Sequence, residues 1–120
     1  MIRIMEGLPD NVLGAEAIGK VTDEDYENVL APAAREMLEV HSKIRYVYVL
    51  GEEFEGWTAG AMWEDAKLGG GDLRRWEKVA VVTDKDWVRH AVKGFGWMIP
   101  GDVRVFSVAE LDTAKAWASS

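Results

Sequence analysis

The sequence predicts one α/β domain, spanning residues 1–120, in which helices pack on a mixed, mostly parallel β-sheet. Three observations lead to this fold class. β-Branched and aromatic segments recur at 44–50, 79–83 and 103–107, and helical segments alternate with them. A pair of N-terminal strands is joined by a short turn. Such alternation implies right-handed βαβ crossovers, so the sheet should be parallel after its opening hairpin.

The opening hairpin is predicted from strands at 2–5 and 12–21, joined by the turn Leu8-Pro9-Asp10-Asn11. Thr22 follows the second strand, and acids occupy positions 23–25. A threonine hydroxyl can cap a helix N-terminus, and an acid three residues later completes a capping box near the positive end of the helix dipole. A helix is therefore predicted to begin after Thr22.

The helix predicted over residues 23–41 carries one apolar stripe and one proline. Pro32 interrupts the stripe. Because an interior proline removes a hydrogen bond and costs about 3 kcal/mol, we expect a kink or break near Ala31. The stripe recurs at the spacings of three and four that one helical face requires: Tyr26, Leu30, Ala33, Met37 and Val40.

The segment Ile44–Leu50 is apolar on both faces, which predicts a central strand covered on both sides. The strands at 79–83 and 103–107 are followed by helices expected at 84–95 and 109–118.

A further helix is expected to begin near Thr58, and Gly69-Gly70-Gly71 separates it from a short segment at 72–76. This glycine run is interpreted as a flexible joint. It follows a helix and lacks the lysine and the hydroxyl residue of a phosphate-binding loop.

Composition narrows the class of protein. The 120 residues contain no cysteine, which excludes a disulfide framework, a thiolate zinc site and a cysteine nucleophile and favours a reducing cytoplasm. The N-terminus has no apolar stretch long enough for a signal peptide or membrane span, so a soluble protein is expected. A formal charge of −7 opposes general binding to nucleic acid, because polyanions are bound through basic patches.

Five blocks in order along the chain carry a family resemblance. They are Gly19–Tyr26, the Leu30-Ala31-Pro32 step, Phe54–Trp57 with Ala61–Asp65, Val79–Asp84 with Trp87, and Val103–Phe106 with Ala114–Trp117. In these blocks the chain resembles the SpoIIAA-like family, which is related to STAS domains and is compared with the CRAL-TRIO lipid-binding fold. The resemblance implies helices against a largely parallel sheet, but no settled biochemical activity.

The resemblance also raises the question of a phosphorylation switch. In STAS-class anti-sigma-factor antagonists a phosphorylatable serine lies in an Asp-Ser-Ser/Thr-Gly turn after the central strand. This chain has Trp57-Thr58-Ala59-Gly60 near that point. Thr58 and Gly60 match loosely, but the aspartate and serine are missing, which argues against a kinase-driven partner switch.

Aromatic residues gather on segments expected near the carboxyl ends of the strands, where open α/β sheets bind ligands. Trp57 and Trp63 would form one wall of an apolar pocket. Trp87, Phe95 and Trp97 would form a movable lid, with hinges at the glycine run and at Gly94 and Gly96. The alternative is that these rings fill the core. The candidate ligand-binding residues are Phe54, Trp57, Thr58, Trp63, Trp87, Phe95 and Trp97.

Residues 86–100 have the basic, aromatic and aliphatic composition of an interfacial membrane segment. The favoured alternative is a helix packed on the sheet with solvated Arg89 and Lys93, because amphipathicity alone does not mark a membrane helix. The candidate membrane contacts are Arg89, Lys93, Trp97, Met98 and Ile99.

The sequence contains little evidence of a catalytic site. His41 and His90 lack the spacing of a metal pair, and the serines lie in no nucleophile-elbow context. No metal or cofactor is expected, and the protein is predicted not to be an enzyme. The predicted function is binding of a small apolar or lipid-like ligand with transient peripheral membrane contact. The alternative is a STAS-like regulatory module that binds a protein partner, and homodimerisation is compatible with either function.

Overall fold

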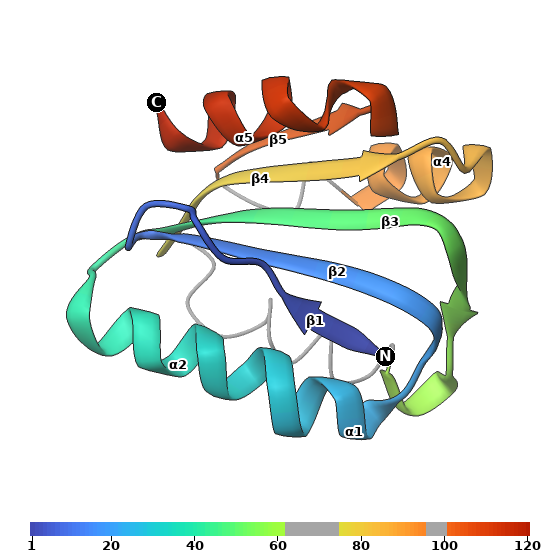
Figure 1. The fold of residues 1–120 in the computed structure, drawn as a ribbon, viewed down its shortest axis with the longest axis horizontal. Helices are drawn as coiled ribbons and strands as arrows, with labels where there is room; N and C mark the ends of the chain where they lie inside the picture. Colours follow the sequence, from blue (N-terminus) through green and yellow to red (C-terminus); the bar gives the residue numbers. More distant parts are fainter. Residues whose placement is uncertain (62–74, 96–100) are drawn as a thin grey trace.

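The computed structural model describes residues 1–61, 75–95 and 101–120, which build one five-stranded sheet with the strand order β1-β2-β3-β4-β5 (Figure 1). β1 is antiparallel to β2, and all later neighbours are parallel. The predicted α/β class and the antiparallel opening hairpin are confirmed. The strands are β1 (Ile2–Ile4), β2 (Val12–Val21), β3 (Ile44–Trp57), β4 (Trp76–Thr83) and β5 (Asp102–Phe106).

Helices cover both faces of this sheet. Figure 1 shows α1 and α2 on one side of the sheet and α5 on the other. Val88 of α4 joins the same buried cluster as Ala34 of α2, so α4 packs on the α2 side. The helical elements are α1 (Asp23–Asp25), the π-helical turn η1 (Tyr26–Leu30), α2 (Ala31–Val40), α4 (Asp86–Phe95), the 3₁₀ turn η4 (Val108–Glu110) and α5 (Leu111–Ser119).

β3 is the central strand, as predicted, and it supplies the core on both faces. Side chains alternate along a strand, so Tyr46 and Tyr48 lie in the cluster under α2 and α4. Val47 and Val49 lie in the second cluster, with Ala114 of α5. All four β3 side chains are buried.

The first helix begins where the sequence predicts. The Thr22 hydroxyl accepts a hydrogen bond from the backbone N–H of Asp25, and the Asp25 carboxylate accepts one from the Thr22 N–H at 2.8 Å. The irregularity expected near Ala31 takes the form of η1, in which the Ala31 N–H donates to the carbonyl of Tyr26, five residues earlier. A regular α-helix then resumes with Pro32 in its first turn, where the missing N–H is tolerated.

Two strands extend beyond their predicted bounds by three residues or more. β3 continues past Leu50 to Trp57, turning at Gly56, whose φ of +134° favours glycine. β4 begins at Trp76, three residues before its predicted start, so Trp76 belongs to this strand and not to the separate segment expected at 72–76. Trp76 pairs with Ile44 and packs edge-on against Tyr46, with ring centroids 5.6 Å apart. This tertiary contact extends the strand. The Gly69–Gly71 joint lies outside the described residues.

Candidate functional site

Three aromatic side chains, Phe54, Trp57 and Trp87, meet at the carboxyl edge of the sheet and are called the aromatic corner here. Phe54 and Trp57 come from the end of β3, and Trp87 from the first turn of α4. The Phe54 and Trp57 centroids are 4.8 Å apart at 62°, and those of Trp57 and Trp87 are 5.6 Å apart at 84°. Phe54 and Trp87 are nearly parallel, at 22° and 5.9 Å. The corner thus joins β3 to the helix that follows β4.

Burial is graded across the aromatic corner. Phe54 is 1% exposed, whereas Trp87 is 50% exposed. Trp57 is partly exposed, and its indole N–H donates to the Tyr48 hydroxyl at 3.2 Å. The hydroxyls of Tyr48 and Tyr26 are 2.9 Å apart. Hydrogen bonds that run from Tyr26 of η1 through Tyr48 therefore orient the Trp57 indole, whereas Trp87 is exposed to solvent.

The structure brings together three of the predicted ligand-binding aromatics and leaves the others undecided. Trp63 and Trp97 lie outside the described residues, as does the side chain of Phe95. Trp57, assigned to a wall, is in edge contact with Trp87, assigned to a lid. The two rings therefore touch each other and enclose no ligand-sized space between them.

Thr58 serves as a helix cap. Its hydroxyl accepts a hydrogen bond from the N–H of Ala61 at 3.1 Å, at the start of the helix expected there. The Asp23 carboxylate lies beside the same turn, because a Cβ added to Gly60 would be 3.3 Å from Asp23 Oδ2. A phosphate on Thr58 would therefore meet a negative charge already present at this helix end.

The basic residues of α4 have unequal environments. Arg89 is half-buried and donates from Nη1 to the Thr83 carbonyl at 3.0 Å, so it is only partly solvated. Lys93 is exposed, and Val88 is buried against the sheet as the packed-helix interpretation requires. Met98 and Ile99 lie outside the described residues.

No helix within the described ranges is long and apolar enough to cross a bilayer. The same part of the chain holds no group of three or more His, Asp or Glu side chains arranged for a metal ion.

The carboxyl edge near β5 is held by capping interactions. The Glu110 carboxylate accepts hydrogen bonds from the backbone N–H and the hydroxyl of Ser107, at 2.9 and 3.0 Å. These bonds hold the pKa of Glu110 below its usual range, and the charge of Arg89 acts in the same direction. Asp84 accepts the N–H of Val108 at 3.0 Å. The Glu110 and Asp84 carboxylates therefore stabilise the turn that follows β5.

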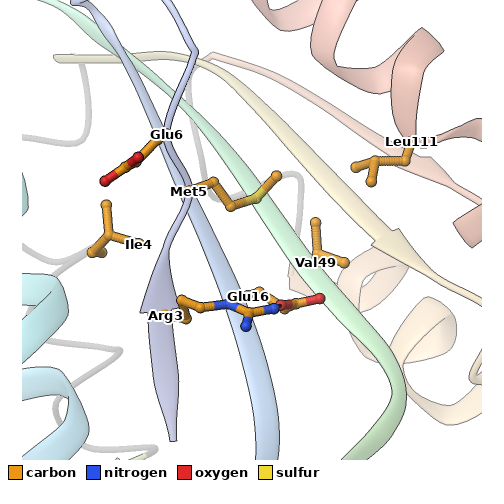
Figure 2. A pocket seen from close by; sticks show the side chains of 7 residues that line it. All are labelled: Arg3, Ile4, Met5, Glu6, Glu16, Val49 and Leu111. Atoms are coloured by element: carbon orange, nitrogen blue, oxygen red, sulfur yellow. Dashed lines mark hydrogen bonds and ion pairs between the residues drawn. The ribbon is translucent and has the colours of Figure 1, made fainter.

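A second feature, a hollow of about 560 Å³ on the α5 side of the sheet, was missed by the sequence analysis. Figure 2 shows the Arg3 and Glu16 side chains together, with Met5 reaching toward Val49. Arg3 and Glu16 are cross-strand partners and form an ion pair. Periodicity could not reveal the hollow, because its lining residues come from β1 and the residues after it, from β2, from β3 and from α5, which are distant in the chain. Its lining residues are Arg3, Ile4, Met5, Glu6, Glu16, Val49 and Leu111.

The comparisons with known proteins agree with this architecture. The family model described as SpoIIAA-like matches residues 12–119. The chain belongs to the SpoIIAA-like family. A solved structure similar to this SpoIIAA-like domain is that of an uncharacterized DUF3478-family protein from Shewanella loihica PV-4, described as having a SpoIIAA-like fold. The two are 27% identical with a TM-score of 0.77, over 98% of this chain and 92% of that one. No curated protein matches the chain.

Membership of the SpoIIAA-like family supplies a fold and no named activity, so function must be argued from side chains. The aromatic corner offers a half-exposed indole backed by buried rings. The hollow offers apolar side chains around a charge pair that is already satisfied. The corner is therefore the stronger candidate for a ligand.

Proposed function

We propose that this SpoIIAA-like domain acts by binding and not by chemistry, and that its aromatic corner receives a small apolar or lipid-like molecule. The observation that carries the proposal is the 50% exposure of Trp87 in contact with Trp57 and the buried Phe54. Aromatic side chains contribute large apolar areas to binding. The corner also lies beyond the carboxyl ends of parallel strands, where open α/β sheets hold ligands.

The two indole side chains, of Trp57 and Trp87, differ in how firmly they are held. Trp57 is tied to the Tyr48 hydroxyl, whereas Trp87 makes no side-chain hydrogen bond with any described residue. Because the two rings are in contact, a ligand would lie on the exposed side of Trp87 or displace that ring. We therefore assign Trp57 to the fixed wall and Trp87 to the movable side.

Binding is tested first by native mass spectrometry of the protein purified from its own type of host, with solvent extraction of anything bound. A discrete extra mass, released on denaturation, is the expected result. Tryptophan fluorescence then follows titration with 1-decanol as a neutral apolar probe. Trp87→Ala should weaken decanol binding about ten-fold or more, because it removes the exposed aromatic surface.

The matched control is Trp117→Ala. Trp117 packs with Phe106 on the α5 side of the sheet, remote from the aromatic corner, so decanol affinity should be retained. Thermal unfolding establishes that both variants are folded. A clean apo mass together with no decanol binding by the wild-type protein would refute the proposal.

A regulatory protein-binding role is the second candidate. It is favoured by a second exposed apolar residue, because Val108, at 36% exposure, follows β5 on the edge that carries Trp87. Its test is a pull-down from host lysate with the wild-type protein and Trp87→Ala as baits. A partner captured by the wild-type protein and lost with Trp87→Ala supports this role, and identical recovery by both baits contradicts it.

A further inference from the structure

We infer that the aromatic corner selects organic cations, with a methylated or alkylated ammonium group as the preferred head of the ligand. The inference rests on the proposed function, because it concerns the same corner, and it narrows the ligand from an apolar molecule to an apolar molecule that carries positive charge. Ring geometry, the environment of the exposed indole and the surrounding charges support it.

The ring geometry suits a cation. Aromatic faces carry partial negative charge, and a cation within about 6 Å of a ring centroid is attracted to the face, most strongly to tryptophan. Trp57 stands at 84° to Trp87 and at 62° to Phe54. Two indoles of different orientation therefore meet at one point, and a rounded alkylammonium group can contact both. Aromatic cages for quaternary ammonium ligands use the same principle.

The exposed part of the corner is available for such contact. Phe54 is almost completely buried and lies nearly parallel to Trp87, so it backs the inner side of that indole. The exposed half of Trp87 then lies on the outer side. The Trp57 indole N–H donates to the Tyr48 hydroxyl, which favours one orientation of that ring.

The charges around the corner favour a positive ligand. Within two chain positions of the three rings lie four exposed carboxylates, Glu52, Glu53, Glu55 and Asp86, and two cations, Lys85 and Arg89. Arg89 is engaged with the Thr83 carbonyl. This excess of acidic over basic residues beside the rings in the sequence, in a chain of formal charge −7, favours cations over anionic head groups.

The deciding experiment compares two ligands of one shape, choline and 3,3-dimethylbutan-1-ol, in which a quaternary carbon replaces the charged nitrogen. NMR titration reads the indole N–H signals of Trp57 and Trp87, so binding is located as well as measured. We expect choline to bind about ten-fold more tightly, in line with cation–π contacts at partly exposed sites.

The outcomes separate this inference from the proposed function. Equal affinity for choline and its neutral isostere, with 1-decanol still bound at the corner, overturns the cation preference and leaves the apolar site standing. No shift at either indole with choline, the isostere or decanol overturns both.

Variants test which groups are responsible. Trp87→Leu keeps an apolar side chain but removes the π face, so it should weaken choline binding more than decanol binding.

The contribution of the carboxylates is tested separately. The double variant Glu53→Gln/Glu55→Gln should lower choline affinity several-fold and leave decanol affinity unchanged. The control Glu36→Gln/Glu39→Gln removes the same charge from exposed positions on α2 and should change neither. Equal weakening by both double variants would overturn local recognition at the corner.

Discussion

At the residue scale, the clearest local device is the capping box at the start of the first helix. Thr22 and Asp25 satisfy each other's backbone N–H groups. Burial alone would raise the pKa of Asp25, but hydrogen bonds from the Thr22 backbone and hydroxyl and the nearby Met1 ammonium, at 3.3 Å, lower it overall. One carboxylate thus joins the start of the helix to the N-terminal strand.

Removal of the cap should be costly. Thr22→Ala is expected to lower the free energy of unfolding by about 1 kcal/mol, because the Asp25 N–H loses its acceptor. Urea denaturation measures the change. The matched control is Thr113→Ala at an exposed position of α5, where alanine is at least as good a helix former and no loss is expected. An equal loss in both variants would contradict the capping argument.

The same carboxylate predicts a pH dependence. The pKa of Asp25 is lower in the folded than in the unfolded protein, so its stabilisation is present above about pH 4 and is lost as pH falls through the folded-state pKa. The stability difference between the wild-type protein and Asp25→Asn should therefore be largest near neutral pH and shrink in more acidic solution. Urea denaturation at pH 7 and pH 3 measures it, and a constant difference would argue against this role.

At the element scale, close backbone approaches and anchored ends decide how the elements fit together. A Cβ at Gly101 would lie 2.1 Å from the carbonyl oxygen of Trp76, so the chain entering β5 can approach β4 this closely only with glycine.

The last turn of α5 is anchored to the sheet by two cations. Arg45 donates a hydrogen bond to the carbonyl of Ala118 at 2.9 Å, and Lys78 donates one to the carbonyl of Trp117 at 3.0 Å. Cations suit the negative end of a helix dipole.

A pair of glycine substitutions tests this packing. Gly101→Ala is expected to destabilise the protein by about 1–3 kcal/mol, because the backbone of β4 or β5 must move to admit the methyl group. Gly51→Ala, on β3, meets no atom within 4 Å and should change stability by less than about 0.5 kcal/mol. Thermal and urea unfolding measure both. A Gly101→Ala protein as stable as Gly51→Ala would show that β5 sits further from β4 than described.

At the scale of the whole molecule, charge sets the character of the surface. The chain has 21 acidic and 14 basic residues. Of the two basic residues assigned to membrane contact on α4, Arg89 is engaged with a backbone carbonyl, which leaves Lys93 exposed. An acidic surface of this kind disfavours anionic lipid and nucleic acid.

Vesicle co-sedimentation tests the membrane hypothesis. At low salt we expect no more binding to phosphatidylserine-containing vesicles than to phosphatidylcholine vesicles, because the protein's net charge of −7 opposes the anionic surface. Binding that rises with phosphatidylserine content and disappears in Trp97→Ala and Ile99→Ala would instead establish the peripheral contact.

Local patterns in the sequence determined the fold class, the antiparallel opening, the cap at Thr22, the central position of β3 and the family. Periodicity, capping and turn chemistry act between near neighbours, so they can be read without the structure. The tertiary structure alone decided that Trp87 meets Phe54 and Trp57, more than 25 residues away in the chain, that Arg89 binds the Thr83 carbonyl, and that residues 5–8 fold over Gly14. The reason is physical: such contacts depend on strand register, sheet twist and helix placement, which bring distant side chains to one edge.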